Sequence, residues 1–446
     1  MRPKAADVGK GPISDRRVLK IALPIVISNA TVPILGAVDT GVVGQIGEAA
    51  PIGAVGLGAI IIAFIYWVFG FLRMGTAGLT AQALGAEEDR EVTALLIRGL
   101  MIAGAAGVGY IILQAPIFWL AFQASPASEE VESLTRAYME IRIWGAPATI
   151  GAYVITGWLV AAERTKEILV LQLWINGLNM ALDIWFVLGL GWGVEGVAIA
   201  TLIAEWSGLA LGLWMCRAAF RGTAWRDKAL IFEAARLKKM ASLNTDIMIR
   251  SVLLEIGFTY FIFRSSGFDD VTLAANQILI QFLFITAYAM DGFAFAAEAL
   301  VGNALGARNR AALRQGAVLS FKWGMICVTF LAAAFWFGGA LIINIMTTSD
   351  EVRTVAYAFL IWIALTPPLG CPSWMFDGIF IGATRGRDMR NSMLISLPIF
   401  LASAEALIPV FGNHGLWAGM LIFFMARGVT LGLRYPSLEA EADLPR

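Results

Sequence analysis

The residue best placed to do chemistry is Asp39, which lies in an apolar stretch from about residue 18 to residue 46. This stretch can cross a bilayer, because about 20 apolar residues span the hydrocarbon. An ionised carboxylate near the centre of a span costs about 2.5–3.5 kcal/mol on insertion scales. The sequence therefore predicts a functional role for Asp39, and the structural alternative is a hydrogen bond that holds helices together.

Two later apolar stretches carry polar pairs at helical spacing. Asn179 and Asp183 are four residues apart and share one face of a helix, and Thr201 and Glu205 have the same spacing. If both faces meet Asp39, two carboxylates lie close together in a low dielectric, which favours sharing a proton or binding a cation. For Asn179 and Thr201 alone, a structural hydrogen bond is an equal alternative. The predicted cation- or proton-coupling nest consists of Asp39, Asn179, Asp183 and Thr201, with Glu205 as candidate support.

The second half of the sequence has its own intramembrane acids. Glu255 and Asp377 lie deepest in apolar sequence, and a cation site and structural hydrogen bonding are equal alternatives for this pair. Asp291 and Glu298 lie two helical turns apart. Glu405 is isolated in apolar sequence, and no partner is predicted for it.

Other residues have structural explanations. Asp246 and Arg250, four residues apart near a membrane boundary, predict a structural ion pair. The three cysteines are scattered, and His414 is the single histidine, so neither a disulfide framework nor a metal site is predicted. The sequence does not suggest a catalytic serine–histidine pair, so we expect a protein that is not an enzyme. We also expect no cofactor beyond a coupling ion, H⁺ or Na⁺.

The composition defines the elements that must position these residues. The 446-residue chain is 59% hydrophobic and 15% charged, whereas soluble domains are usually about 45–50% apolar and about 25% charged. Its net charge of zero provides no basic field for nucleic acid. The sequence therefore predicts an all-α, polytopic membrane protein. Its twelve expected spans lie near residues 18–46, 52–83, 93–120, 131–161, 167–190, 194–220, 243–264, 271–305, 313–346, 352–383, 391–411 and 415–435.

Basic residues gather in alternate connections, and the longest basic connection covers residues 217–239. Because Lys and Arg favour the cytoplasmic side, both termini should face the cytoplasm of a bacterial inner membrane. The segment ALIFEAARLKKM in this connection is expected to lie on the membrane surface as an amphipathic piece.

An internal comparison predicts two halves. GLTAQALGAEEDREVTALL resembles EALVGNALGARNRAALRQG, and GWLVAAERTKE resembles GIFIGATRGRD, in the same order about half a chain apart. This order indicates two parallel repeats. The expected division is an N-terminal tail (1–17), an N-lobe (18–220), a linker (221–242), a C-lobe (243–435) and a C-terminal tail (436–446), with both tails cytoplasmic.

Five segments together resemble the multidrug and toxic compound extrusion (MATE) family. They are GAVDTGVVGQIG, NMALDIWFVLGLGWGVEGVAIATLIAEW, LAANQILIQFLF, DGFAFAAEALVGNALGAR and DGIFIGATRGRDMRNSM, and they extend over both halves of the chain. Within the family the sequence looks like the branch named for the bacterial DNA-damage-inducible protein F. The resemblance implies two six-helix lobes around a cavity, and export of organic cations or other amphiphiles against entry of H⁺ or Na⁺.

The resemblance also implies roles for single residues. An aspartate, asparagine, aspartate and threonine of the family's N-lobe site would correspond to Asp39, Asn179, Asp183 and Thr201. Pro24 would match the proline where the first helix bends when the site is protonated. Acids used in the C-lobe by other branches correspond to Glu255 and Asp377. Relatives in this branch often lack the first of these acids, so the coupling lobe and the ion stay open.

These observations predict a secondary active multidrug efflux antiporter with two-lobe alternating access. Its expected partners are small amphiphilic or cationic organic substrates and membrane lipid, with no nucleic acid, and we expect a monomer. The alternative is a flippase-type exporter of a lipid-linked or other amphiphilic metabolite, which a basic patch would favour. The few intramembrane arginines, chiefly Arg73 and Arg142, argue against that alternative.

Overall fold

The computed structural model describes residues 12–45, 49–123 and 128–443. In these ranges the chain forms helices and no strand, which confirms the predicted all-α class. The first helix, α1 (Asp15–Gly44), runs unbroken through Pro24 and Pro33. The later helices of the first half are α2 (Ala49–Trp67), α3 (Phe71–Gly85), α4 (Asp89–Ile112), α5 (Gln114–Gln123), α6 (Glu129–Arg142), α7 (Ala146–Ala161), α8 (Thr165–Asp183) and α9 (Gly193–Met215).

The second half follows the short helix α10 (Lys228–Ile231). Its helices are α11 (Ala234–Ser265), α12 (Asp270–Gly306), α13 (Arg310–Met346), α14 (Asp350–Ala358), α15 (Leu360–Gly382), α16 (Gly386–Phe411), α17 (Asn413–Gly432) and α18 (Tyr435–Glu441).

Eleven of the twelve predicted spans have a counterpart that is long and apolar enough to cross a membrane, with α14 and α15 counted as one span bent by 43°. The remaining span is α11, whose 32 residues extend over about 48 Å. Asp246, Arg250 and Glu255 make α11 more polar than the other spans. Counting α11 as a span gives the twelve membrane helices that the sequence predicts.

The described residues form two compact units that differ from a simple division in chain order. The first unit contains residues 27–80 and 88–234, and the second contains residues 12–26, 81–87 and 235–443. The change of unit within α1 falls between Val26 and Ile27, just after Pro24. The division into an N-lobe (18–220), a linker (221–242) and a C-lobe (243–435) stays a prediction.

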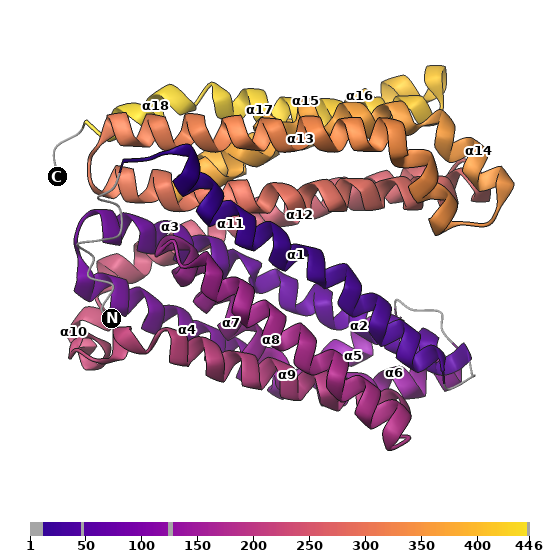
Figure 1. Ribbon diagram of the computed structural model, residues 1–446, viewed down its shortest axis with the longest axis horizontal. Coiled ribbons are helices and arrows are strands. Elements are labelled where there is room, and N and C mark those ends of the chain that lie inside the picture. Colours follow the sequence, from indigo (N-terminus) through magenta and orange to yellow (C-terminus); the bar gives the residue numbers. More distant parts are fainter. Residues whose placement is uncertain (1–11, 46–48, 124–127, 444–446) are drawn as a thin grey trace. The chain divides into compact units, whose positions relative to one another are not determined.

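In the first unit α8 packs beside α9, α4 beside α7, and α6 beside both α2 and α9. Gly157 permits one close approach, because a Cβ atom there would lie 2.3 Å from the carbonyl oxygen of Arg73. α8 and α9, which carry Asn179, Asp183 and Thr201, therefore lie side by side in this unit (Figure 1).

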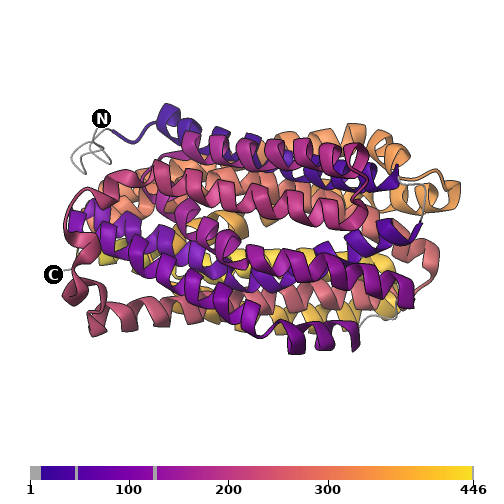
Figure 2. The ribbon, with the colours of Figure 1, turned by 90° about the horizontal axis from the view of Figure 1, so that it is seen from below.

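In the second unit α12 lies beside α13 and α15, and α17 lies beside α15 and α16. These helices run side by side in both views (Figure 1 and Figure 2). Its core contains fully buried aromatic side chains, and Asn276 adds a buried polar network by accepting from Trp417 Nε1 at 2.8 Å and pairing with Asn413. Buried amides with paired donors and acceptors stabilise such a core.

The segment ALIFEAARLKKM is divided between two helices, because α10 ends at Ile231 and α11 begins at Ala234. Its position on the membrane surface stays a prediction. Arg98 holds α10 by donating to the carbonyl oxygens of Leu230 and Ile231 at 2.6 and 2.8 Å.

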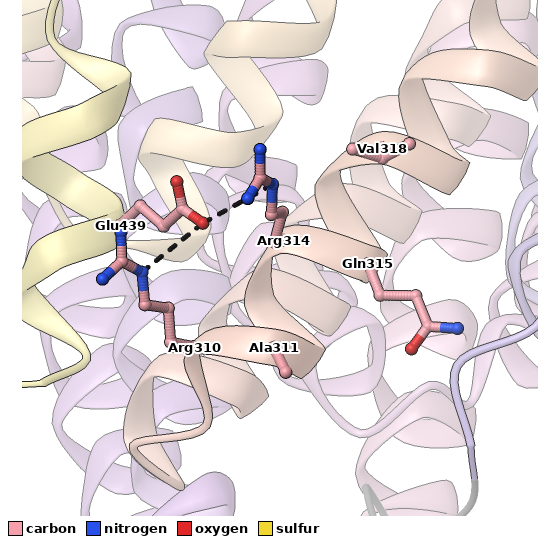
Figure 3. Close-up of a pocket in the computed structure, with 6 residues that line it drawn as sticks. All are labelled: Arg310, Ala311, Arg314, Gln315, Val318 and Glu439. Carbon is pink, nitrogen blue, oxygen red and sulfur yellow. Dashed lines mark ion pairs between the residues drawn. The ribbon is translucent and has the colours of Figure 1, made fainter.

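The C-terminal tail, residues 436–446, is largely helical up to residue 441 as part of α18. Figure 3 shows the Glu439 carboxylate between the guanidinium groups of Arg310 and Arg314, at 3.6 and 3.8 Å. Asp443 adds a 2.7 Å ion pair with Arg310, and Glu441 adds a 2.8 Å pair with Arg385. These ion pairs attach the tail to the first residues of α13 and the start of α16.

Candidate functional site

The four residues of the predicted nest come together in the first unit. The hydrogen-bond partners of the Asn179 side-chain amide define its orientation. Its NH₂ group then donates to Asp183 Oδ2 at 2.9 Å and to Asp39 Oδ1 at 3.3 Å, while its oxygen accepts from the Thr201 hydroxyl at 2.9 Å. One amide thus links the carboxyl groups of α1 and α8 with the hydroxyl group of α9. We call Asp39, Asn179, Asp183 and Thr201 the N-lobe nest.

Because the Asn179 NH₂ group donates to both, the carboxyl groups of Asp39 and Asp183 lie close to each other. Two carboxyl groups this close together in a low dielectric favour sharing one proton, because like charge and burial both disfavour two ionised carboxylates. The Asp183 side chain is fully buried, and its Oδ1 atom has no hydrogen-bond partner among the described residues. The pair can therefore hold one shared proton and still offers an open oxygen to a cation.

Local helix structure positions these groups. α8 ends at Asp183 and continues as a π-helical segment, Ile184–Gly189. π-Helical segments are rare in proteins, and those that occur often lie at functional sites. One turn before Asn179, Asn176 donates to the Thr31 hydroxyl of α1 at 2.7 Å. α8 therefore holds α1 at two successive levels, through Asn176 and through the nest.

An ion pair that the sequence analysis missed lies beside the nest. Arg142 donates to Glu205 through both terminal nitrogens, at 2.7 and 2.9 Å, and both side chains are largely buried. The Arg142 guanidinium also attracts the carboxyl groups of Asp39 and Asp183. Glu205, the candidate support of the nest, binds Arg142 through both carboxylate oxygens. The position of Arg142 in apolar sequence could have predicted this ion pair, because a charge among membrane helices needs an acidic partner.

The first unit therefore has an excess of acid around the nest. Three carboxyl groups, from Asp39, Asp183 and Glu205, face one guanidinium, from Arg142. An uncompensated negative charge among buried helices is costly, and a proton or another monovalent cation offsets it. This arrangement can bind and release a cation.

The second unit places Asp377 differently from expectation. Its Oδ2 atom accepts from Arg427 Nη2 at 2.5 Å and also from Arg250 Nη2. Of the two alternatives for Glu255 and Asp377, these contacts favour structural hydrogen bonding of Asp377 over a joint cation site, since two guanidinium groups already bind its carboxylate. The predicted ion pair between Asp246 and Arg250 is also wrong: Arg250 binds Asp377, and Asp246 pairs with Arg390 at 2.6 Å.

Glu255 lines a cavity of about 530 Å³ between α11 and α12. Its wall is mainly apolar and contains the aromatic rings of Phe258, Phe263 and Phe284. Glu255 forms no ion pair within the described part of the chain. An apolar cavity with one carboxylate has the chemistry to hold an amphiphilic cation.

The remaining predicted acids have separate surroundings. Glu405 is not isolated, because it accepts from the Tyr260 hydroxyl at 2.6 Å and from Arg264 at 2.9 Å. Glu298 is buried on α12, and Asp291 is half-buried on the same helix. Among the described residues, no group of three or more acids, histidines and cysteines could hold a metal ion.

Twelve apolar helices with ionisable side chains held among them are typical of a membrane transporter. The profile of the family described as MatE matches residues 24–185 and 247–404. The DNA damage-inducible protein F of Escherichia coli (strain K12) is 37% identical over 435 residues, which cover 94% of this chain and 91% of that protein. The chain therefore belongs to the MatE family, as its resemblance predicted.

More distant relatives agree over nearly the whole length. A probable multidrug resistance protein NorM of Shewanella oneidensis is 25% identical, with 91% of each chain covered. The chain has the fold of a solved multidrug resistance MATE family transporter in an outward-facing conformation, with a TM-score of 0.88, 19% identity and all of both chains covered. Solved structures of MATE in bent and in straight conformations each give a TM-score of 0.87 at 18% identity with all of both chains covered.

Proposed function

We propose that this protein is a secondary active antiporter that exports amphiphilic or cationic organic compounds in exchange for H⁺ or Na⁺. The observation that carries the proposal is the N-lobe nest, where Asn179 joins the carboxyl groups of Asp39 and Asp183 beside an open carboxylate oxygen. Membership of the MatE family and the multidrug resistance named for several relatives support it.

In this proposal the coupling ion and the substrate disfavour each other's binding. Loading a proton or Na⁺ removes the excess negative charge of the nest and changes how Asn179 holds α1 against α8. α1 then bends near Pro24, close to where it passes from one unit to the other. The linkage is reciprocal, so substrate also lowers the affinity for the ion. A membrane potential adds about 2.3 kcal/mol per charge per 100 mV.

The cavity beside Glu255 is our candidate for holding a substrate in the second unit. Its volume of about 530 Å³ suits a drug-sized compound. The aromatic rings offer apolar contact, and the carboxylate attracts a positive charge. We further propose a monomer in a bacterial inner membrane, with both termini cytoplasmic, no enzymatic activity and no nucleic-acid partner.

One observation favours the alternative of a flippase-type exporter of a lipid-linked or other amphiphilic metabolite. Buried arginines argue for an anionic substrate, and Arg73 and Arg142 are not the only arginines in the membrane-spanning part of the described chain. Arg250 and Arg427 are also buried among the membrane helices.

Efflux from reconstituted proteoliposomes tests the antiporter. A fluorescent amphiphilic cation is loaded inside, and a proton gradient or a sodium gradient is imposed. We expect one gradient to drive efflux by the native protein, Asp39→Asn to abolish it, and Glu405→Gln to retain it as the matched control outside the nest. Efflux that Asp39→Asn leaves unchanged would exclude coupling through the nest, and a native protein that neither gradient drives would favour the flippase.

A further inference from the structure

Three charged side chains converge on one oxygen atom in the second unit. Arg250 of α11 and Arg427 of α17 both donate to Oδ2 of Asp377 on α15. The side chains are 8%, 2% and 12% exposed, respectively. We call Arg250, Asp377 and Arg427 the C-lobe triad.

The C-lobe triad carries one more positive charge than negative. In the described part of the chain, Arg250 and Arg427 each form an ion pair with Asp377 and with no other carboxylate. Two guanidinium groups therefore share one carboxylate. A charge left without a counterion among membrane helices is costly and marks a functional group.

One hydrogen-bond donor of the C-lobe triad, the buried Nε atom of Arg250, has no partner among the described residues. The planar guanidinium group has donors spaced to bind the two oxygens of a carboxylate or phosphate. Arg250 uses Nη2 for Asp377, and its Nε remains available to a second anion.

We propose that the C-lobe triad binds an anionic group of the transported amphiphile, a carboxylate, sulfonate or phosphate. The inference rests on the proposed transport function and narrows the substrate class, because a purely cationic compound gains nothing from this charge. The bound anion neutralises the triad and occupies the free donor of Arg250. The triad and the cavity beside Glu255 would then recognise opposite charges of one class of zwitterionic amphiphile.

The test uses two dyes that differ only in the anionic group, the free acid of rhodamine B and its ethyl ester. Their binding to the full-length protein is measured by fluorescence in phosphatidylcholine nanodiscs without any ion gradient. We expect the native protein to bind the free acid more tightly than the ester. Arg250→Gln should lower the affinity for the free acid about tenfold, because a hydrogen bond to a charged group is lost. The affinity for the ester should not change.

The controls separate charge from fold. Arg250→Gln leaves a balanced pair of Asp377 and Arg427, so it should fold, and Arg250→Lys should recover much of the binding of the free acid. Arg390→Gln removes an arginine of the same unit outside the triad, and it should change the binding of neither dye. If Arg250→Gln does not fold, competition by inorganic phosphate on the native protein decides: displacement of the free acid alone supports the site, and equal displacement of both dyes overturns it.

Equal binding of the two dyes by the native protein would also overturn the proposal. If phosphatidylglycerol in the nanodisc removes the preference for the free acid, the triad binds a lipid phosphate and the substrate assignment is wrong. These binding results do not depend on coupled transport. A failure of gradient-driven efflux therefore contradicts the antiporter, and a failure of charge discrimination contradicts the triad.

Discussion

The N-lobe nest and the C-lobe triad are built from the same kinds of groups but have opposite charge. Each joins side chains of three helices among apolar neighbours. Around the nest three carboxyl groups face Arg142, whereas in the triad two guanidinium groups face Asp377. Two units with related sequence patterns therefore need not bind the same ligand. The first has the charge to gain a cation, and the second has the charge to gain an anion.

The largest effect should come from Asp183→Asn. The substitution removes the ability of Asp39 and Asp183 to share a proton while preserving volume, so gradient-driven efflux should fall to the level of empty liposomes. Arg250→Gln, which leaves Asp377 and Arg427 as a balanced pair, is the comparison in the second unit, and it should retain coupling to the gradient with the cationic ester as substrate. Coupling that is lost with Arg250→Gln and kept with Asp183→Asn would reverse the roles of the two units.

The next effect concerns stability. Glu205→Gln leaves the buried Arg142 guanidinium without its ion-pair partner, and the free energy of unfolding should fall by about 3–5 kcal/mol. Thermal unfolding of the purified protein measures the change. In the double variant Arg142→Met with Glu205→Met, the free energy of unfolding should fall much less, because no charge remains unpaired. A double variant as unstable as Glu205→Gln would show that packing, not charge, holds this pair.

Arg250→Gln should have a smaller effect on stability than Glu205→Gln. Arg427 continues to bind Asp377 after the substitution, so the expected loss is about 1 kcal/mol. The same unfolding measurement compares the two variants directly. A loss as large as that of Glu205→Gln would mean that the triad has no excess of positive charge.

The smallest effect should come from Glu405→Gln. Its ion pair with Arg264 is 54% and 34% exposed, and exposed pairs contribute about 0–1 kcal/mol. Stability and transport should both stay close to those of the native protein. A large loss of either would mean that the second unit has a further functional acid.

Much of the nest could be predicted from the sequence, because local spacing decides it. Asn179 and Asp183 share a helical face whatever the rest of the fold does, and each intramembrane acid needs a polar neighbour. Hydropathy likewise predicted the membrane helices. The charged residues of α11 lower its mean hydropathy, so this helix is less apolar than the other spans.

Partners from distant helices could not be predicted. The spacing of Asp246 and Arg250 allows a pair on α11, but Arg390 and Asp377 compete for these side chains from other helices. Glu405 had no local partner, and its neighbours Tyr260 and Arg264 come from another helix. Spacing along one helix shows which contacts are allowed, whereas packing decides which of them form.

Release of the coupling ion on substrate binding is the most direct test of opposite roles for the two regions. Rhodamine B ethyl ester is added to the purified protein in weak buffer, and released ions are followed with a pH indicator and a Na⁺-sensitive dye. We predict that the native protein and Arg250→Gln both release one of these ions and that Asp39→Asn releases neither. Undiminished release from Asp39→Asn, or its loss in Arg250→Gln, would contradict the account.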